Sequence, residues 1–242
     1  MTRRPLIFDI ETIGDLTAEN RDEVARLATG RDVAADAYAA LCPPLARVVC
    51  IAWLDAGTQQ LSAVFDATLL SGVAPEKLDL SDGTGRSHAV SCDLHGAAGE
   101  AALLKTFAAV VEQHLAQANG QLITYNGRGF DIPVLIHRSI KHGVTDGRTL
   151  LAKAMGENRF RPCLHVDLMD VVTFYGASNR WPMSTYVIGY GYHSPKTAMS
   201  GADVSPAVQA GRILDVVRYC AGDVLATTQL HGRVSCLLPT PE

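Results

Sequence analysis

Apolar and polar positions along this chain follow two different patterns, and together they predict an α/β fold. Runs of β-forming residues at 5–11, 47–55 and 60–66 predict strands, and the last two are close enough to form a hairpin. Residues 98–117 have apolar positions three and four apart, which predicts a helix. Mixing strands with amphipathic helices is typical of a sheet covered by helices.

The remaining segments fit around these elements as insertions in a single domain of residues 1–242. Residues 14–46 predict a helical insertion, which Pro43-Pro44 interrupts. Residues 67–97 are rich in Gly, Ser and Asp and predict a loop-rich insertion with one strand at residues 88–94. Residues 144–203 predict helices joined by loops.

The first predicted strand carries two acids, Asp9 and Glu11, in the sequence FDIET. Residues two apart in a strand point to the same face, so these carboxylates project together while Phe8 and Ile10 face a core. Acids on a buried strand need a partner or a metal ion. An exposed strand end is the plainer interpretation, and this motif alone does not decide between them.

A second segment combines a strand at Leu122 to Tyr125, a turn with two glycines at residues 126–129, and an amphipathic helix. Asp131 lies at the helix start, just before Pro133, a residue favoured in a first turn. The turn permits a close backbone approach to a ligand, and Arg128 within it can meet a phosphate. By itself Asp131 also fits an ordinary helix cap.

A long amphipathic helix is predicted near the end of the chain, and it places Tyr219 and Asp223 four residues apart on one face. A mid-helix aspartate and the neighbouring Gly222 both have poor helix propensity. Two such penalties in one turn indicate a functional site. The alternative is a solvated aspartate beside a core tyrosine.

Four carboxylates aimed at one point repel each other unless cations lie between them. Hard oxygen ligands of this kind suit Mg²⁺ or Mn²⁺. Two such ions about 3.5–4 Å apart are a known device for cleaving phosphodiesters. The sequence therefore predicts a metal-dependent phosphodiesterase site made of Asp9, Glu11, Asp131 and Asp223.

The D-x-E, N-x₃-F-D and Y-x₃-D blocks, in this order, resemble the three exonuclease motifs of the DEDD superfamily. They are most similar to the proofreading exonuclease domain of B-family DNA polymerases and to stand-alone predicted 3′–5′ exonucleases related to it. The sister branch has a histidine five residues before the last aspartate. Arg218 stands there in this chain, so the tyrosine branch is indicated. Ala221 and Gly222 depart from the acid expected after the cysteine.

The resemblance implies a ribonuclease H-like fold with a mixed central sheet flanked by helices. It implies two Mg²⁺ or Mn²⁺ ions, with Asp9 bridging both, Glu11 and Asp223 completing the first, and Asp131 holding the second. Tyr219 would orient the attacking water. The nucleic-acid contacts implied are Asn126, Arg128 and Phe130.

The expected activity is removal of nucleoside 5′-monophosphates from the 3′ ends of single strands, with DNA as the preferred substrate. Two alternatives stay open: an RNA-directed 3′–5′ exonuclease, and a nucleic-acid end-binding module without catalysis. Aromatic residues beside the site offer base stacking or, more simply, core packing: Trp181, Tyr186, Tyr190 and Tyr192.

Composition agrees with a folded globular enzyme. The 242 residues are 48% hydrophobic with a net charge of −4, and the mean hydropathy is +0.11. Lys and Arg are most frequent between Arg128 and Arg161, where they favour a phosphate backbone or a solvated surface. No run is long enough for a membrane span. The six cysteines form no C-x-x-C pair, so we expect reduced thiols in a cytoplasmic protein. The sequence does not predict an oligomeric state.

Overall fold

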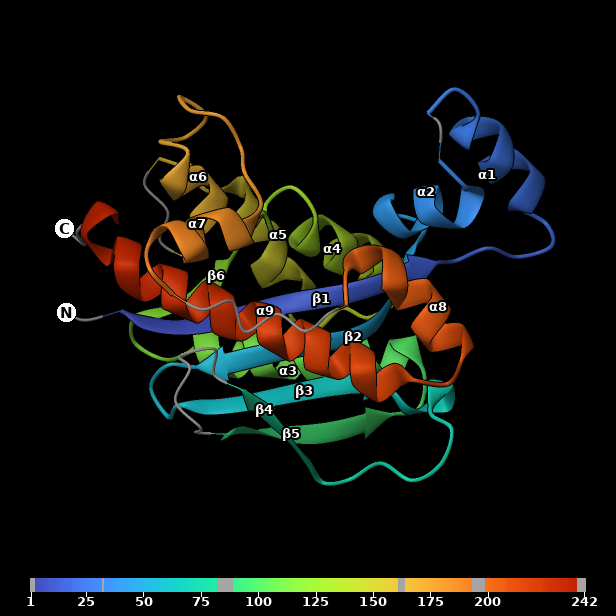
Figure 1. Ribbon diagram of the computed structural model, residues 1–242, viewed down its shortest axis with the longest axis horizontal. Coiled ribbons are helices and arrows are strands. Elements are labelled where there is room, and N and C mark those ends of the chain that lie inside the picture. Colours follow the sequence, from blue (N-terminus) through green and yellow to red (C-terminus); the bar gives the residue numbers. More distant parts are fainter. Residues whose placement is uncertain (1–2, 32, 82–88, 161–163, 193–198, 239–242) are drawn as a thin grey trace.

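The computed structural model describes residues 3–31, 33–81, 89–160, 164–192 and 199–238, built around one seven-stranded sheet (Figure 1). Across the sheet the strands lie in the order β4-β5-β3-β2-β1-β6-β7. Their bounds are β1 (Arg4–Gly14), β2 (Ala46–Asp55), β3 (Gln60–Asp66), β4 (Lys77–Ser81), β5 (Ala89–Ala97), β6 (Gly120–Thr124) and β7 (His165–Asp167).

The centre of the sheet is an antiparallel meander of β1, β2 and β3. On the other side of β1, strands β6 and β7 run parallel to it. Strand β6 pairs with β1 only from Arg4 to Ile7, so the second half of β1 continues beyond this partner. A register shift between Glu11 and Thr12 marks a β-bulge on the β2 side.

Helices cover both faces of this sheet. Their bounds in the described residues are α1 (Arg21–Ala28), α2 (Ala35–Leu41), α3 (Glu100–Leu115), α4 (Asp131–Lys141), α5 (Arg148–Gly156), α6 (Leu168–Val172), α7 (Met183–Gly189), α8 (Val204–Gln209) and α9 (Ile213–Val234). Figure 1 shows α9 lying across one face of the sheet, with α3 behind it on the other.

Two buried clusters correspond to these two layers. One joins alternate strand residues such as Ile7 and Ala52 to α6, α7, α8 and α9. The other joins Phe8, Ile10 and their neighbours to α3, α4 and α5. Each strand therefore buries side chains on both faces, as its dense apolar sequence requires. None of the described helices has both the length and the apolar content needed to cross a membrane.

The elements confirm most of the predicted strands and helices, including the β2–β3 hairpin and helices α1 and α2 within residues 14–46. Residues 67–97 differ from the prediction of loop with a single strand, because β4 and β5 pair there as an antiparallel edge. Leu78 and Leu80 are 4% and 8% exposed, and this short alternation supplies the inward face of β4. The division into one domain with two insertions stays a prediction.

Candidate functional site

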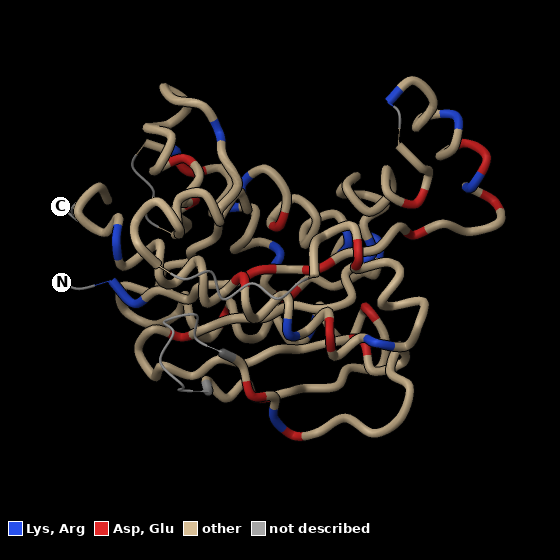
Figure 2. Tube along the Cα trace, in the orientation of Figure 1, with Lys and Arg blue, Asp and Glu red and all other residues tan. Residues whose placement is uncertain are grey.

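Strand β1 presents its two acids to the face that α9 covers. Asp9 is half-buried and Glu11 is 9% exposed. Phe8 and Ile10 alternate with them and lie in the opposite cluster, against α3 and α4. The predicted geometry of the D-x-E motif is therefore confirmed. Figure 2 shows acidic positions gathered near the middle of the molecule, where α9 crosses β1.

Helix α9 brings Tyr219 and Asp223 to the same place. Each side chain is 8% exposed. The Tyr219 hydroxyl is hydrogen-bonded to Asp223, and the charges of Glu11 and Asp9 also act on it. Burial first, and then these three carboxylates, raise the pKa of the phenol well above its ordinary value. Tyr219 is thus a neutral hydroxyl beside three acids and not a tyrosine confined to the core.

Asp131 enters from a third element as the first residue of α4. Its carboxylate receives hydrogen bonds from its own backbone and from that of Ile10, the residue between the two acids of β1. This contact is possible because β6 stops pairing with β1 at Ile7. Burial, followed by the charges of Asp167 and Asp223, raises the pKa of Asp131 to about 7.

Asp167, at the end of β7, holds the turn that precedes Asp131. Its carboxylate accepts from the backbone N–H groups of Asn126 (2.7 Å), Arg128 (2.9 Å) and Met169 (2.9 Å). Asn126 has a left-handed backbone (φ 65°). The Met169 contact makes Asp167 the cap of helix α6. The local sequence does not show that the same carboxylate also holds the turn at residues 126–129.

Gly127 within this turn has a steric requirement. A Cβ at this position would lie 2.3 Å from the Oγ1 atom of Thr124. Thr124 in turn contacts the buried His165 side chain at 2.8 Å. The glycine therefore permits the close packing of the turn against β6 and β7.

The three residues predicted to contact nucleic acid differ in their burial and in their contacts within the protein. Asn126 is partly buried at the start of the turn. Arg128 is 17% exposed in its side chain and directs Nε toward Asp170 (3.5 Å). Phe130 precedes α4 and packs partly against the cluster under α3. Their contacts with nucleic acid stay predictions, and for Arg128 such a contact would compete with Asp170.

The predicted aromatic residues divide between core and surface. Tyr186, Tyr190 and Tyr192 pack against the α9-side cluster. Trp181 is 53% exposed, and its carbonyl accepts a 2.5 Å hydrogen bond from the hydroxyl of Tyr125. Base stacking by Trp181 therefore stays a prediction.

Cys220 also lies beside this site. The sequence predicted it only to be a reduced thiol. Its Sγ lies 3.4 Å from the backbone oxygen of Asp9 and 3.8 Å from Asp9 Oδ2. Ligand atoms of Asp9, Glu11 and Cys220 fall within 4.8 Å of one another. Burial raises the pKa of this thiol well above its ordinary value, and hard divalent cations prefer oxygen to sulfur ligands. The described cysteines are free thiols, whereas Cys163 lies outside the described residues.

The two acids of β1 fit a hard divalent cation. Oxygen atoms of Asp9 and Glu11 lie close enough to share one ion, and Mg²⁺ and Mn²⁺ prefer oxygen ligands. Asp131 of α4 and Asp223 of α9 interact electrostatically with each other. The charges of neighbouring carboxylates help to raise the pKa of Asp131, and a bound cation would offset that repulsion. The structure thus contains a carboxylate site that can hold a divalent metal ion.

Comparisons with known proteins agree with this geometry. The structure is similar to that of the family B DNA polymerase from the hyperthermophilic archaeon Pyrobaculum calidifontis, with a TM-score of 0.58 and 16% sequence identity. The match covers 97% of this chain and 25% of the polymerase chain, so the chain spans about a quarter of that protein. The predicted ribonuclease H-like fold is confirmed.

No curated protein matches the sequence. A family model does match residues 81–238, described as a predicted 3′–5′ exonuclease related to the exonuclease domain of PolB. This region contains Asp131, Tyr219 and Asp223, and the fold adds Asp9 and Glu11 from outside it. The chain belongs to the family of predicted 3′–5′ exonucleases related to the exonuclease domain of PolB.

Proposed function

We propose that this protein is a metal-dependent 3′–5′ exonuclease that releases nucleoside 5′-monophosphates from single-stranded DNA. The observation that carries the proposal is the convergence of acids from three elements. Asp9 and Glu11 come from β1, Asp131 from α4 and Asp223 from α9. Membership of the predicted exonuclease family supports the same conclusion.

Asp9, Glu11, Asp131 and Asp223 would hold a pair of Mg²⁺ or Mn²⁺ ions. When bound, such ions supply Lewis-acid activation of water and stabilise the charge of a leaving oxygen. These side chains would be held in place before any ion binds, because β1 and α9 are packed into the core and the backbone of Ile10 acts on the Asp131 carboxylate.

Tyr219 is suited to orient the attacking water. Its hydroxyl has one proton and two lone pairs, and the proton is directed to Asp223. The lone pairs then accept a proton of a neighbouring water and fix the direction of its oxygen. Because the pKa of Tyr219 is raised, the hydroxyl keeps its own proton throughout the working pH range.

The strand itself would be held beside the turn at residues 126–129. Asn126, Arg128 and Phe130 flank Asp131 there and are the proposed contacts with the terminal nucleotides. Asp167 keeps the backbone of this turn in place. Placing a phosphodiester correctly against the carboxylates is a large part of the catalysis that such a site can provide.

The test is a degradation time course on matched single strands of DNA and RNA labelled at the 5′ end, with Mg²⁺ or Mn²⁺. We expect a ladder that shortens from the 3′ end of DNA, and no cleavage in excess EDTA. A block at the 3′ end should protect the strand, whereas a block at the 5′ end should not. Faster cleavage of RNA would reassign the substrate. Binding without cleavage would indicate an end-binding module, and equal cleavage of circular strands would indicate an endonuclease.

A further inference from the structure

The chain leaves helix α6 through two aromatic residues in left-handed backbone conformations. Phe174 has φ 50° and Tyr175 has φ 58°, and Gly176 follows with φ 94°. Glycine adopts this region freely, whereas a bulky side chain is strained there. Two backbone hydrogen bonds close the turn. Tyr175 N–H donates to the carbonyl oxygen of Asp170 (2.6 Å), and Gly176 N–H donates to the carbonyl oxygen of Thr173 (3.2 Å). The result is a Phe174 side chain that is 60% exposed.

A second exposed ring lies against the same turn. Phe160 is 57% exposed, and its ring centroid is 5.0 Å from that of Tyr175, with the planes tilted by 50°. The guanidinium of Arg159 lies 5.7 Å from the centre of the Phe160 ring. We call these four residues, Arg159, Phe160, Phe174 and Tyr175, the aromatic surface.

Ion pairs join the aromatic surface to the loop of the carboxylate site. Arg159 Nη2 lies 2.5 Å from one oxygen of Asp170, and Arg128 Nε lies 3.5 Å from the other. The backbone of Arg128 is held by Asp167, whose charge acts on Asp131. Only a few contacts therefore separate the exposed rings from a proposed metal ligand.

The exposed charge beside the rings is a cation. Asp170 is buried and is shared by the guanidinium groups of Arg128 and Arg159, of which Arg159 is the more exposed. The Arg159 side chain is 37% exposed and open to a solution partner. Flat exposed rings next to guanidinium groups match a chain of bases joined by phosphates.

We propose that the aromatic surface binds the bases of the single strand a few nucleotides before the 3′ end that enters the carboxylate site. The proposal rests on the proposed exonuclease function for its choice of partner. Phe174 and Phe160 stack on bases, and Arg159 meets the backbone between them. Stacking is indifferent to base identity, so this surface gives affinity without sequence preference.

The experiment measures binding of a short fluorescent single strand in EDTA by anisotropy, for the wild type and for Phe174→Ala, Phe174→Leu and Phe160→Ala. We expect each variant to bind about 5- to 100-fold more weakly, because stacking on one ring is lost. Val73→Ala is the matched control. It removes an exposed apolar side chain (95% exposed) before β4, the strand at the far edge of the sheet from β7, and should bind as the wild type does.

A cycle with abasic strands identifies the interaction as stacking. A strand without bases at these positions should bind wild type more weakly, and Phe174→Ala should cause little further loss. Unchanged strand affinity of the Phe variants would overturn the proposal. So would independent effects, in which Phe174→Ala weakens binding of the abasic strand by the same factor as it weakens binding of the intact strand. So would a wild-type dimer in sedimentation that Phe174→Ala dissociates, because the surface would then join two copies of the chain.

Hydrolysis of thymidine 5′-(p-nitrophenyl phosphate) with Mn²⁺ separates this proposal from the proposed function. This ester has no strand beyond its phosphate, so the Phe variants should hydrolyse it at the wild-type rate. Absence of hydrolysis by the wild type, of the ester and of strands alike, would refute the exonuclease function. The binding cycle would still decide whether the aromatic surface holds a strand.

Discussion

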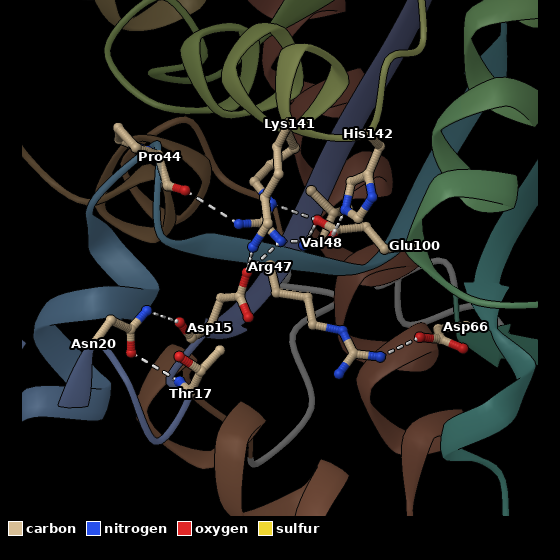
Figure 3. Close-up of polar contacts among 11 residues, drawn as sticks. Asp15, Thr17, Asn20, Pro44, Arg47, Val48, Asp66, Glu100, Lys141 and His142 are labelled. Atoms are coloured by element: carbon tan, nitrogen blue, oxygen red, sulfur yellow. Dashed lines mark hydrogen bonds and ion pairs between the residues drawn. The ribbon is translucent and has the colours of Figure 1, made fainter.

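The two ends of helix α4 contain buried charges in opposite arrangements. At its first residue, Asp131 is grouped with other carboxylates, and burial and their charges raise its pKa to about 7. Near its last turn, Arg138 is 1% exposed and forms ion pairs with Asp15 and Glu100. Figure 3 shows these two acids with Lys141 and His142. Both ends bury charge, but only the second brings charges of opposite sign together.

The Arg138 end forms a network that is complete within the protein. Arg138 donates to Glu100 through Nε (2.8 Å) and Nη2 (2.5 Å), and to Asp15 through Nη2 (2.7 Å). Glu100 also accepts from the backbone of Val48 (2.8 Å) and contacts His142 (2.7 Å). A buried charge with its hydrogen bonds satisfied in this way needs no ligand.

The pKa values of Asp15 and Asp131 show the same contrast, because one is lowered and the other is raised. Burial by itself raises the pKa of both carboxyl groups. For Asp15, hydrogen bonds from Lys141 and Arg138 outweigh burial, and the pKa is lowered. For Asp131, carboxylates add to the effect of burial. One end of α4 therefore stabilises the fold through paired charges, whereas the other end gathers charges of like sign, which lower its stability.

The largest effect is expected from Asp9→Asn, which removes one charge from the carboxylate cluster. Exonuclease kcat should fall on the order of 10³-fold or more, because an essential ligand is lost. Added Mn²⁺ should stabilise the wild type by about 2.7 kcal/mol at a hundred times its Kd, and this shift should shrink in the variant. Nuclease rates test the loss of kcat, and thermal melts with and without Mn²⁺ test the smaller stabilisation by the ion. Full activity in excess chelator would contradict the metal-site assignment.

Arg138→Met should act on the other end of α4 and lower stability by about 3–5 kcal/mol, because Glu100 keeps its charge without its main partner. Denaturant melts measure this loss. Arg26→Met is the matched control, since Arg26 pairs with Glu23 on the exposed surface and its replacement should change little. The folded fraction of Arg138→Met should keep its kcat within a few-fold. A large loss of kcat at unchanged stability would place this network in the catalytic machinery.

Asp131→Asn should stabilise the metal-free protein at pH 8 by on the order of 2 kcal/mol while abolishing activity. The folded pKa of Asp131, about 7, lies above the ordinary value of 3.8, so wild-type stability should rise as pH falls from 8 toward 4. The variant lacks this rise, and the difference between the two proteins should close only near pH 4. Melts in EDTA across this range are the measurement.

In the same experiment, Asp15→Asn should change stability in the opposite direction from Asp131→Asn. Its folded pKa is lowered, so it contributes stability above the unfolded pKa and loses it as pH falls through the folded value. The variant should therefore be less stable than wild type at pH 8. If both substitutions destabilise at pH 8, the contrast between the two ends of α4 is wrong.

The smallest effect is expected from Tyr219→Phe, which keeps the ring but removes the hydroxyl. If the hydroxyl orients the attacking water, kcat should fall by at least about tenfold. Melting temperature and strand Kd should change little, because packing and the carboxylates are retained. Single-turnover rates isolate this step, and unimpaired turnover would remove Tyr219 from the mechanism while leaving the four carboxylates in place.

Local periodicity was sufficient to predict the acids of β1 and the Tyr219–Asp223 pair. Both arise from the side-chain spacing of a single element, which the sequence contains directly. The position of Asp131 at a helix start also follows from local residues. The arrangement of all four carboxylates around one point stays a prediction, which the electrostatic effects of these acids on Asp131 and Tyr219 support.

What could not be predicted depends on partners from other elements. The sequence shows that Arg128 is charged but not that it faces Asp170, which lies on α6. It does not show that Asp167 accepts a hydrogen bond from the backbone of Asn126. Strand β4 was missed because five residues among Gly, Ser and Asp give little periodic signal, and pairing with β5 supplies the rest.

The crossing of α9 over β1 determines when during synthesis the acids of this site can come together. Cys220 of α9 contacts Asp9 across 211 positions of sequence, and Asp223 lies one helical turn further along. A growing chain on the ribosome holds the D-x-E strand early, but its four acids cannot come together until α9 has emerged and docked. The complete carboxylate cluster therefore exists only in a chain that has folded through α9.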